Sequence, residues 1–115
     1  MLSKNRRISR EEFPYILKNA KRYNSPSLLL YITSADRDGS KESKFSFSVS
    51  KKVCSKAVDR NRFRRWGYSA VRGSLKQVCL GYFCFFSFKK TPKPISFSVV
   101  EKEVRELLSL SGVLR

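Results

Sequence analysis

The sequence predicts an α+β fold in which one small sheet packs against helices as a single domain over residues 1–115. A chain of 115 residues suffices for one hydrophobic core and is too short for two. Hydrophobic residues make up 41% of the chain and aromatic residues 13%, enough for a packed interior. Segments of helical and strand periodicity follow one another in the order α-β-β-α-β-α, which is typical of a compact sandwich.

The first of these segments predicts a helix over about residues 9–22. Residues 9–12 read S-R-E-E and match a capping box, in which Ser9 and Glu12 satisfy the free amides of a helix start. Apolar residues then recur at helical spacing, at Phe13, Ile16, Leu17 and Ala20. The helix should end before Pro26.

Two strand-like segments come next. Residues 28–34 form a β-prone run, and residues 44–50 alternate strictly, with Phe45, Phe47 and Val49 on one face and serines on the other. The polar residues 35–43 between them predict a hairpin loop.

A basic helix is predicted over residues 57–72. At about 100° per residue, Phe63, Trp66 and Ala70 fall within a narrow arc that can pack on a sheet. The rest of the helix surface carries Arg60, Asn61, Arg64, Arg65, Tyr68 and Arg72, with Arg62 at its far edge. Gly67 is a flaw in this helix, costing about 1 kcal/mol relative to Ala, and Gly73 is a plausible stop.

The last two segments are a buried strand and a helix. Residues 79–88 are apolar almost throughout, as in an inner strand covered on both faces. Val100, Val104, Leu107 and Leu108 form a helical stripe, with either Ser96 or Ser98 as its N-cap.

The charge of the chain points to a polyanionic partner. The net charge is +16, and residues 51–72 alone carry eight basic residues against Asp59. Arginine suits phosphate because its planar fork donates two parallel hydrogen bonds and keeps its charge. Several arginines on one helix face therefore favour binding to RNA or DNA, and the spacing of charges does not separate the two.

Catalysis by the protein's own side chains is weakly supported. The chain has no histidine, so the commonest general base is missing. Cys54, Cys79 and Cys84 fit no disulfide framework and make a poor zinc site, so we expect small buried side chains in a reducing compartment. No apolar run approaches the roughly 20 residues of a membrane span and no signal peptide is evident, so a cytoplasmic location is expected.

Residues 47–53 and 57–65 carry a more specific pattern. They read F-S-V-S-K-K-V and A-V-D-R-N-R-F-R-R, and they resemble the signature of the bacterial ribonuclease P protein subunit. That family has a strand ending in S-V-S-K-K-V-G, a short loop, and then A-V-x-R-N-R followed by apolar and basic residues. The resemblance extends weakly to residues 7–13, to Tyr31 and to residues 95–104, and so covers nearly the whole chain.

The chain departs from the family pattern in several places. Cys54 stands where glycine is usual, and the loop before Ala57 is one residue longer. Residues 66–68, W-G-Y, replace a basic and apolar continuation, and Leu17 stands where a second aromatic residue is common.

The resemblance implies an accessory subunit of a ribonucleoprotein endonuclease. In this family a large RNA is the catalyst and cleaves precursor tRNA at its 5′ end with Mg²⁺, which the RNA mainly holds. The protein would contribute no catalytic residue and no organic cofactor. Its partners would be the catalytic RNA and the 5′ leader of precursor tRNA, with no membrane and no obligate protein partner. The family also implies a left-handed crossover between the parallel strands that hold Phe47 and Phe85, against the usual handedness.

Carried over by position, the resemblance assigns two surfaces. The catalytic RNA would be bound by Lys51, Lys52, Arg60, Asn61, Arg62, Arg64 and Arg65. The leader would lie in a cleft between the first helix and the sheet, lined by Phe13, Leu17, Leu29, Tyr31 and Ser48. Strand alternation agrees with this division, because it leaves Leu28, Leu30 and Ile32 for the core. For Phe13 and Leu17 the sequence alone favours ordinary core packing at least as well.

Two other classes of function remain open. A structural RNA-binding protein, such as a ribosomal protein, would share the size and charge of this chain without a role in cleavage. A nuclease with its active site in the protein is less well supported, because Asp and Glu are scattered over loops and helix starts. The strand-loop-helix signature favours the ribonuclease P subunit over both.

Overall fold

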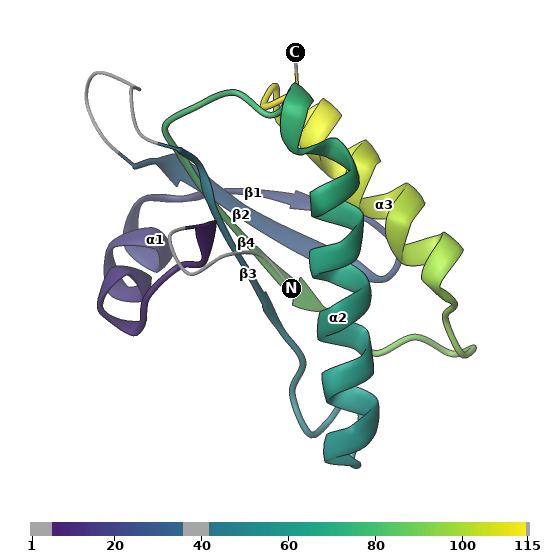
Figure 1. The fold of residues 1–115 in the computed structure, drawn as a ribbon. Helices are drawn as coiled ribbons and strands as arrows, with labels where there is room; N and C mark the ends of the chain where they lie inside the picture. Colours follow the sequence, from purple (N-terminus) through teal and green to yellow (C-terminus); the bar gives the residue numbers. More distant parts are fainter. Residues whose placement is uncertain (1–5, 36–41, 115) are drawn as a thin grey trace.

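The structure is a computed structural model that describes residues 6–35 and 42–114. Its elements are, in chain order, the 3₁₀ turn η2 (Arg10–Glu12), α1 (Phe13–Asn19), β1 (Lys21–Asn24), β2 (Leu28–Ser34), β3 (Lys44–Ser48), α2 (Ala57–Ser74), the 3₁₀ turn η3 (Leu75–Gln77), β4 (Tyr82–Phe88) and α3 (Phe97–Leu110). The strands form one sheet, with α2 and α3 on one face and α1 on the other (Figure 1). The predicted α+β sandwich is confirmed, with one strand more than expected.

The strand order is β1-β2-β4-β3, so β2 and β3 are not neighbours. The predicted hairpin between residues 28–34 and 44–50 is therefore wrong, and most of its loop, residues 36–41, lies outside the described residues. β4 runs between the two strands, antiparallel to β2 and parallel to β3. Its phenylalanine-rich sequence explains this place, because an inner strand is the one whose two faces are both covered.

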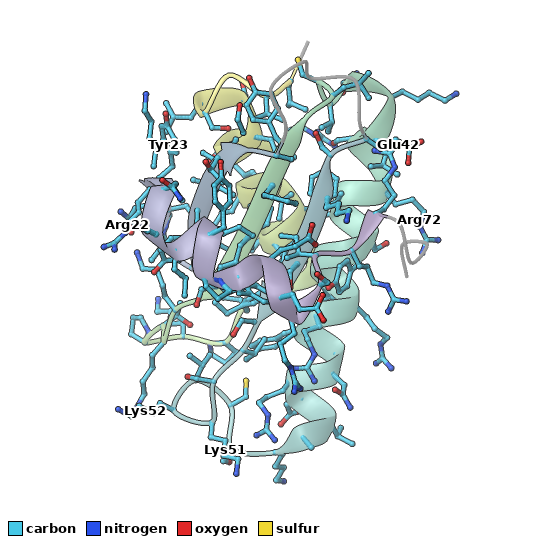
Figure 2. The ribbon with its side chains drawn as sticks, turned by 90° about the vertical axis from the view of Figure 1, so that its left-hand side faces the viewer. Arg22, Tyr23, Glu42, Lys51, Lys52 and Arg72 are labelled. Carbon is cyan, nitrogen blue, oxygen red and sulfur yellow. The ribbon has the colours of Figure 1, made fainter. Side chains whose placement is uncertain are left out.

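The connection from β3 through α2 to β4 joins two parallel neighbours. In Figure 1 β3 lies in front of β4, with α2 and α3 to the right of the sheet. In Figure 2, turned by 90°, β3 lies to the right of β4 and α2 lies behind the sheet. When the sheet is viewed from the helix side and turned so that both strands point up, β4 lies to the left of β3. The crossover is left-handed, as the resemblance implied and contrary to the common rule.

The first helix starts where the sequence predicts and ends earlier. Glu12 closes the predicted capping box: its Oε1 accepts hydrogen bonds from the Ser9 N–H at 2.8 Å and from the Ser9 hydroxyl at 2.9 Å, and the Glu12 N–H donates to the Ser9 backbone oxygen at 3.1 Å. α1 ends at Asn19, and the predicted extension to residue 22 is wrong because residues 21–24 form β1. These residues find their backbone partners on β2 instead of within the helix, from Lys21 opposite Ile32 to Asn24 opposite Leu29.

The main core lies between the sheet and the helices α2 and α3. The predicted inward sets of β2 and β3 are buried, and in the sheet both meet alternate residues of β4. Phe47 lies at the centre, with its ring stacked on Phe86 at 4.7 Å and edge-on to Tyr68 at 5.1 Å. The strand residues buried in this core are Leu28, Leu30, Ile32, Phe45, Phe47, Cys84, Phe86 and Phe88.

α2 is rotated relative to the predicted arc. Ala70 is buried as expected, but Phe63 and Trp66 are only half-buried. The helix lies very close to the sheet at Gly67, where an added Cβ would clash with the ring of Phe47. This contact turns Tyr68 and Val71 inward, so the prediction of an outward Tyr68 is wrong, and Gly67 is a packing requirement. Gly73 does not stop the helix, which continues to Ser74.

A buried carboxylate joins α3 to the turn between β1 and β2. The side chain of Ser96 caps α3 by accepting a hydrogen bond from the Val99 N–H at 3.4 Å. Two turns later Glu103, 6% exposed, accepts hydrogen bonds from the Ser27 N–H at 2.8 Å and from the Ser25 hydroxyl. These hydrogen bonds hold the turn between β1 and β2, where the pairing of the edge strand β1 with β2 begins.

The cysteines and the helix lengths bear on two further expectations. All three thiols are free; Cys84 is fully buried, whereas Cys54 and Cys79 are partly exposed. Burial raises the pKa of the Cys84 thiol. Among residues 6–35 and 42–114, no helix combines the length and the apolar composition needed to cross a membrane.

Replacing Gly67 with Ala should destabilise the protein by about 1–3 kcal/mol, because the new methyl group meets a Phe47 ring that is held by its neighbours. Replacing Gly73 with Ala, in the same helix, should stabilise it by up to about 1 kcal/mol, because nothing lies within 4 Å of that Cβ. Urea unfolding of the two variants measures both effects. Equal effects of the two substitutions would contradict the close packing of α2 on Phe47.

The charge of Glu12 predicts an acid-sensitive contribution to stability. Burial raises the pKa of Glu12, but the hydrogen bonds from the Ser9 backbone and hydroxyl, with the Lys44 ammonium, outweigh it and bring the pKa below 4.5. Because the pKa is lowered by folding, the stability that Glu12 contributes is complete above pH 4.5 and is lost as the pH falls through the folded-state pKa.

The variant Glu12→Gln should melt roughly 1–4 °C below the parent protein at pH 7, because its amide keeps the cap and loses the ion pair with Lys44. The difference between the two melting temperatures should narrow below pH 4.5 as the parent carboxylate is protonated. Glu11→Gln, at the exposed neighbouring position, is the control, and a constant difference across the pH range would refute the assignment.

Candidate nucleic-acid interface

The exposed side of α2 and the loop before it form a basic surface. Lys51, Lys52, Asn61, Arg62 and Arg65 are exposed and Arg64 is half-buried; together we call these six residues the α2 basic surface. Lys51 and Lys52 lie at the end of the molecule where α2 begins (Figure 2). Arg72, which the assignment did not include, lies two helical turns after Arg65 on the same exposed side.

Arg60, predicted to face the RNA, is turned toward the loop that precedes its own helix. Its Nη1 donates hydrogen bonds to the backbone oxygens of Cys54 at 2.9 Å and Ser55 at 2.8 Å. The side chain is half-buried. Arg60 therefore holds the end of the loop that carries Lys51 and Lys52.

The remaining residues of the α2 basic surface differ in how firmly they are held. Arg62 pairs with Asp59 at 3.1 Å and lies over the ring of Trp66, 5.5 Å from its centroid. Arg64 donates to the Asn61 side-chain oxygen, so that Asn61 orients a neighbouring guanidinium. Because exposed ion pairs contribute little free energy, the pair with Asp59 does not prevent Arg62 from binding a phosphate. Arg65 has no side-chain partner among the described residues and projects freely from the helix.

A row of rings crosses the sheet face opposite α2. Tyr31 on β2 stacks on Phe85 of β4 with 5.5 Å between centroids, and Phe13 of α1 meets Phe85 edge-on at 5.1 Å. The Arg22 guanidinium of β1 lies 5.4 Å from the centre of the Tyr31 ring. The three rings are half-buried, and each retains a surface that another flat group could contact. We call Phe13, Arg22, Leu29, Tyr31, Ser48 and Phe85 the aromatic face.

α1 covers only part of this side of the sheet. Ile16 is fully buried under the helix and forms a second small core with Ile8 and Phe83, and Phe13 packs against it. Leu17 is 53% exposed and takes no part in that cluster. Core packing therefore describes Phe13 in part and Leu17 not at all, and the assignment of Leu17 to the leader cleft stays a prediction.

The other two predicted cleft residues lie in one row of the sheet. Leu29 on β2 and Ser48 on β3 both pair in register with Ser87 of β4, which places all three on the side that carries Tyr31. Phe85 and Arg22 were missed by the sequence assignment. Strand parity could have found Phe85, because it alternates with the buried Cys84 and Phe86, whereas β1 itself was not predicted.

Three comparisons with known proteins agree with this architecture. The family model described as Ribonuclease P matches residues 1–110. A ribonuclease P protein component of Microcystis aeruginosa is 26% identical over 106 residues, covering 91% of this chain and 88% of its own length.

Two solved structures are similar over nearly the whole chain. The Staphylococcus aureus RNase P protein has a TM-score of 0.82 at 17% identity and covers 98% of this chain and 100% of its own. The Thermotoga maritima RNase P protein has a TM-score of 0.79 at 20% identity, with 90% and 96% covered. At these identities the two structures establish a shared fold, and the match of the family model over residues 1–110 adds the family itself. This chain belongs to the ribonuclease P protein component family.

Proposed function

We propose that this protein is the subunit of ribonuclease P that binds the catalytic RNA through the α2 basic surface and the 5′ leader of precursor tRNA through the aromatic face. The RNA would perform the endonucleolytic 5′ maturation of tRNA, and the protein would tighten binding of the substrate. Family membership supports the association with ribonuclease P. The observation that carries the division of labour is that α2 and α1 lie on opposite faces of one sheet (Figure 1), and that the half-buried rings pack with Phe13 of α1.

The aromatic face suits single-stranded RNA. A base that stacks on a ring contributes roughly 1–3 kcal/mol whatever its identity, because every base has a flat π surface. Tyr31 and Phe85 offer such surfaces, and the Arg22 guanidinium beside Tyr31 can reach a neighbouring phosphate. Binding of this kind tolerates varied leader sequences, as a general processing enzyme requires.

The α2 basic surface suits a folded RNA of high charge density. Its cations lie along one helix and the loop before it, and among the described residues of the loop and helix the only carboxylate is Asp59. Bringing these cations against phosphates releases counterions, which gives strong binding with little dependence on sequence. The same contacts relieve the repulsion within a chain of net charge +16.

The proposed reaction places the metal on the RNA. Over the described part of the chain, no group of three or more His, Cys, Asp or Glu side chains could hold a metal ion. We propose that the RNA mainly holds the Mg²⁺, as the resemblance to the family implies. The free thiols suit a reducing compartment, and we place the reaction in the cytoplasm.

Cleavage of precursor tRNA by the cognate catalytic RNA tests this function. At low Mg²⁺ the added protein should raise the cleavage rate and lower the concentration of precursor tRNA that gives half of the maximal rate. A folded protein that leaves cleavage unchanged would instead support a structural RNA-binding protein with no role in processing. Turnover by the protein alone, with the RNA removed, would place the active site in the protein and overturn the proposal.

Replacing Tyr31 with Ala should weaken binding of precursor tRNA to the assembled ribonucleoprotein by roughly tenfold, the loss of one stacked base. Binding of mature tRNA without a leader should stay unchanged. Tyr31→Phe keeps the ring and should behave like the parent protein. Equal losses for the two substrates would remove Tyr31 from the leader site.

Replacing Arg65 with Ala should weaken binding to the catalytic RNA and reduce the slope of log K against log salt by about one unit, with an unchanged melting temperature. Arg60→Ala should also lower the melting temperature, because two loop carbonyls lose their donor. Arg105→Ala, which removes an exposed cation from α3, is the control. If the Arg65 and Arg105 variants have the same slope, the α2 basic surface is not the RNA contact.

A further inference from the structure

A cavity of about 490 Å³ opens where the N-terminal segment crosses the edge of β3 beside α2. The segment is fixed there by a parallel bridge between Arg7 and Phe45, and the Ile8 N–H donates to the Phe45 oxygen at 3.1 Å. Three elements contribute the lining, which consists of Arg7, Ile8, Ser9, Lys44 and Tyr68. None of these five belongs to the α2 basic surface or to the aromatic face.

Tyr68 lines this cavity, and its hydroxyl has no hydrogen-bond partner among the described residues. Its residue is 7% exposed, with the ring packed edge-on against Phe47 at 5.1 Å. No described residue accepts from or donates to its hydroxyl. Among the described residues, every fully enclosed side-chain nitrogen or oxygen has a hydrogen-bond partner. The hydroxyl of Tyr68 is not among the enclosed, unsatisfied groups, and the cavity that Tyr68 lines gives a ligand access to this residue.

The charges around the cavity favour an anion. Arg7 is exposed and forms no ion pair within the described residues, whereas its neighbour Arg6 pairs with Glu42 at 3.0 Å. Lys44 contributes a second cation, partly neutralised by Glu12 at 3.2 Å. A free guanidinium and a buried phenol that offers its hydroxyl are both donors suited to phosphate oxygens.

We propose that this cavity binds a phosphodiester group of RNA, with the Arg7 guanidinium and the Tyr68 hydroxyl as its donors. The inference rests on the proposed function, because it takes RNA as the partner, and it adds a third contact. Lys44 points to the α1 side of the sheet, in register with Phe83, and Tyr68 comes from the α2 side. An RNA strand held at this edge would connect the aromatic face with the α2 basic surface.

The test uses Arg7→Ala, Tyr68→Phe and the double variant, in the full chain. Affinities are measured over a range of salt for two probes: the cognate catalytic RNA binding the protein, and precursor tRNA binding the assembled ribonucleoprotein. Each single substitution should weaken binding of one probe by roughly three- to tenfold, and Arg7→Ala should lower its salt slope by about one unit. The double variant should lose less than the product of the single losses, since both groups would contact one phosphate.

Matched controls isolate the cavity from general effects. Arg105→Ala removes an exposed arginine elsewhere, and Tyr82→Phe removes a hydroxyl that has no partner among the described residues. A loss confined to the catalytic-RNA probe assigns the phosphate to that RNA, and a loss confined to precursor tRNA assigns it to the substrate. Either result supports the site.

Two outcomes would overturn the inference, and they are distinguishable. If Arg7→Ala and Tyr68→Phe match their controls on both probes while Arg65→Ala still weakens RNA binding, the cavity is not a phosphate site and the proposed function stands. If the parent protein itself binds neither probe, the proposed function and this inference fail together.

Discussion

The close approach of α2 to Phe47 is the contact on which the arrangement of this protein depends. The ring of Phe47 occupies the space that a side chain at position 67 would need, and it is stacked on the ring of Phe86. Because this contact fixes the rotation of α2 about its axis, it also decides which residues face solvent. Tyr68 and Val71 turn inward, and Asn61 and Arg65 turn outward. A packing constraint in the core thus sets the geometry of the proposed RNA surface.

The sheet is used on both sides, and strand parity separates the two uses. Residues 84, 86 and 88 of β4 enter the main core, and residues 83, 85 and 87 face α1. α1 has seven residues and covers only part of that side, burying Ile16 and leaving Tyr31 and Phe85 half-exposed. A longer helix would have buried those rings in a second complete core. The short helix leaves them available to a ligand, which is the basis of the proposed leader site.

The arginines of α2 do different work although they share one helix. Arg60 donates hydrogen bonds to carbonyl oxygens of its own loop. Arg62 is held by an ion pair with Asp59 and by its contact with the Trp66 ring, whereas Arg65 has no protein partner among the described residues. Positions that look equivalent in a basic motif therefore divide into those that shape the surface and those that can bind. In the proposed function this preorganisation lowers the entropy lost on binding, because the loop and two guanidinium groups are already placed.

The sequence by itself determined the elements with strong local patterns. The capping box at Ser9 and the alternation around Phe47 are patterns of residues two to four positions apart, and the charge of residues 51–72 belongs to one short segment. Each of these patterns lies in the element that the sequence predicted. The family signature added the left-handed crossover, which no local pattern carries. Only the tertiary structure decided the insertion of β4 between β2 and β3, the edge strand β1 and the inward turn of Tyr68. These features depend on partners beyond the reach of local periodicity, such as Phe47 against Gly67 and Lys21 opposite Ile32, and such contacts are settled by packing of the whole chain.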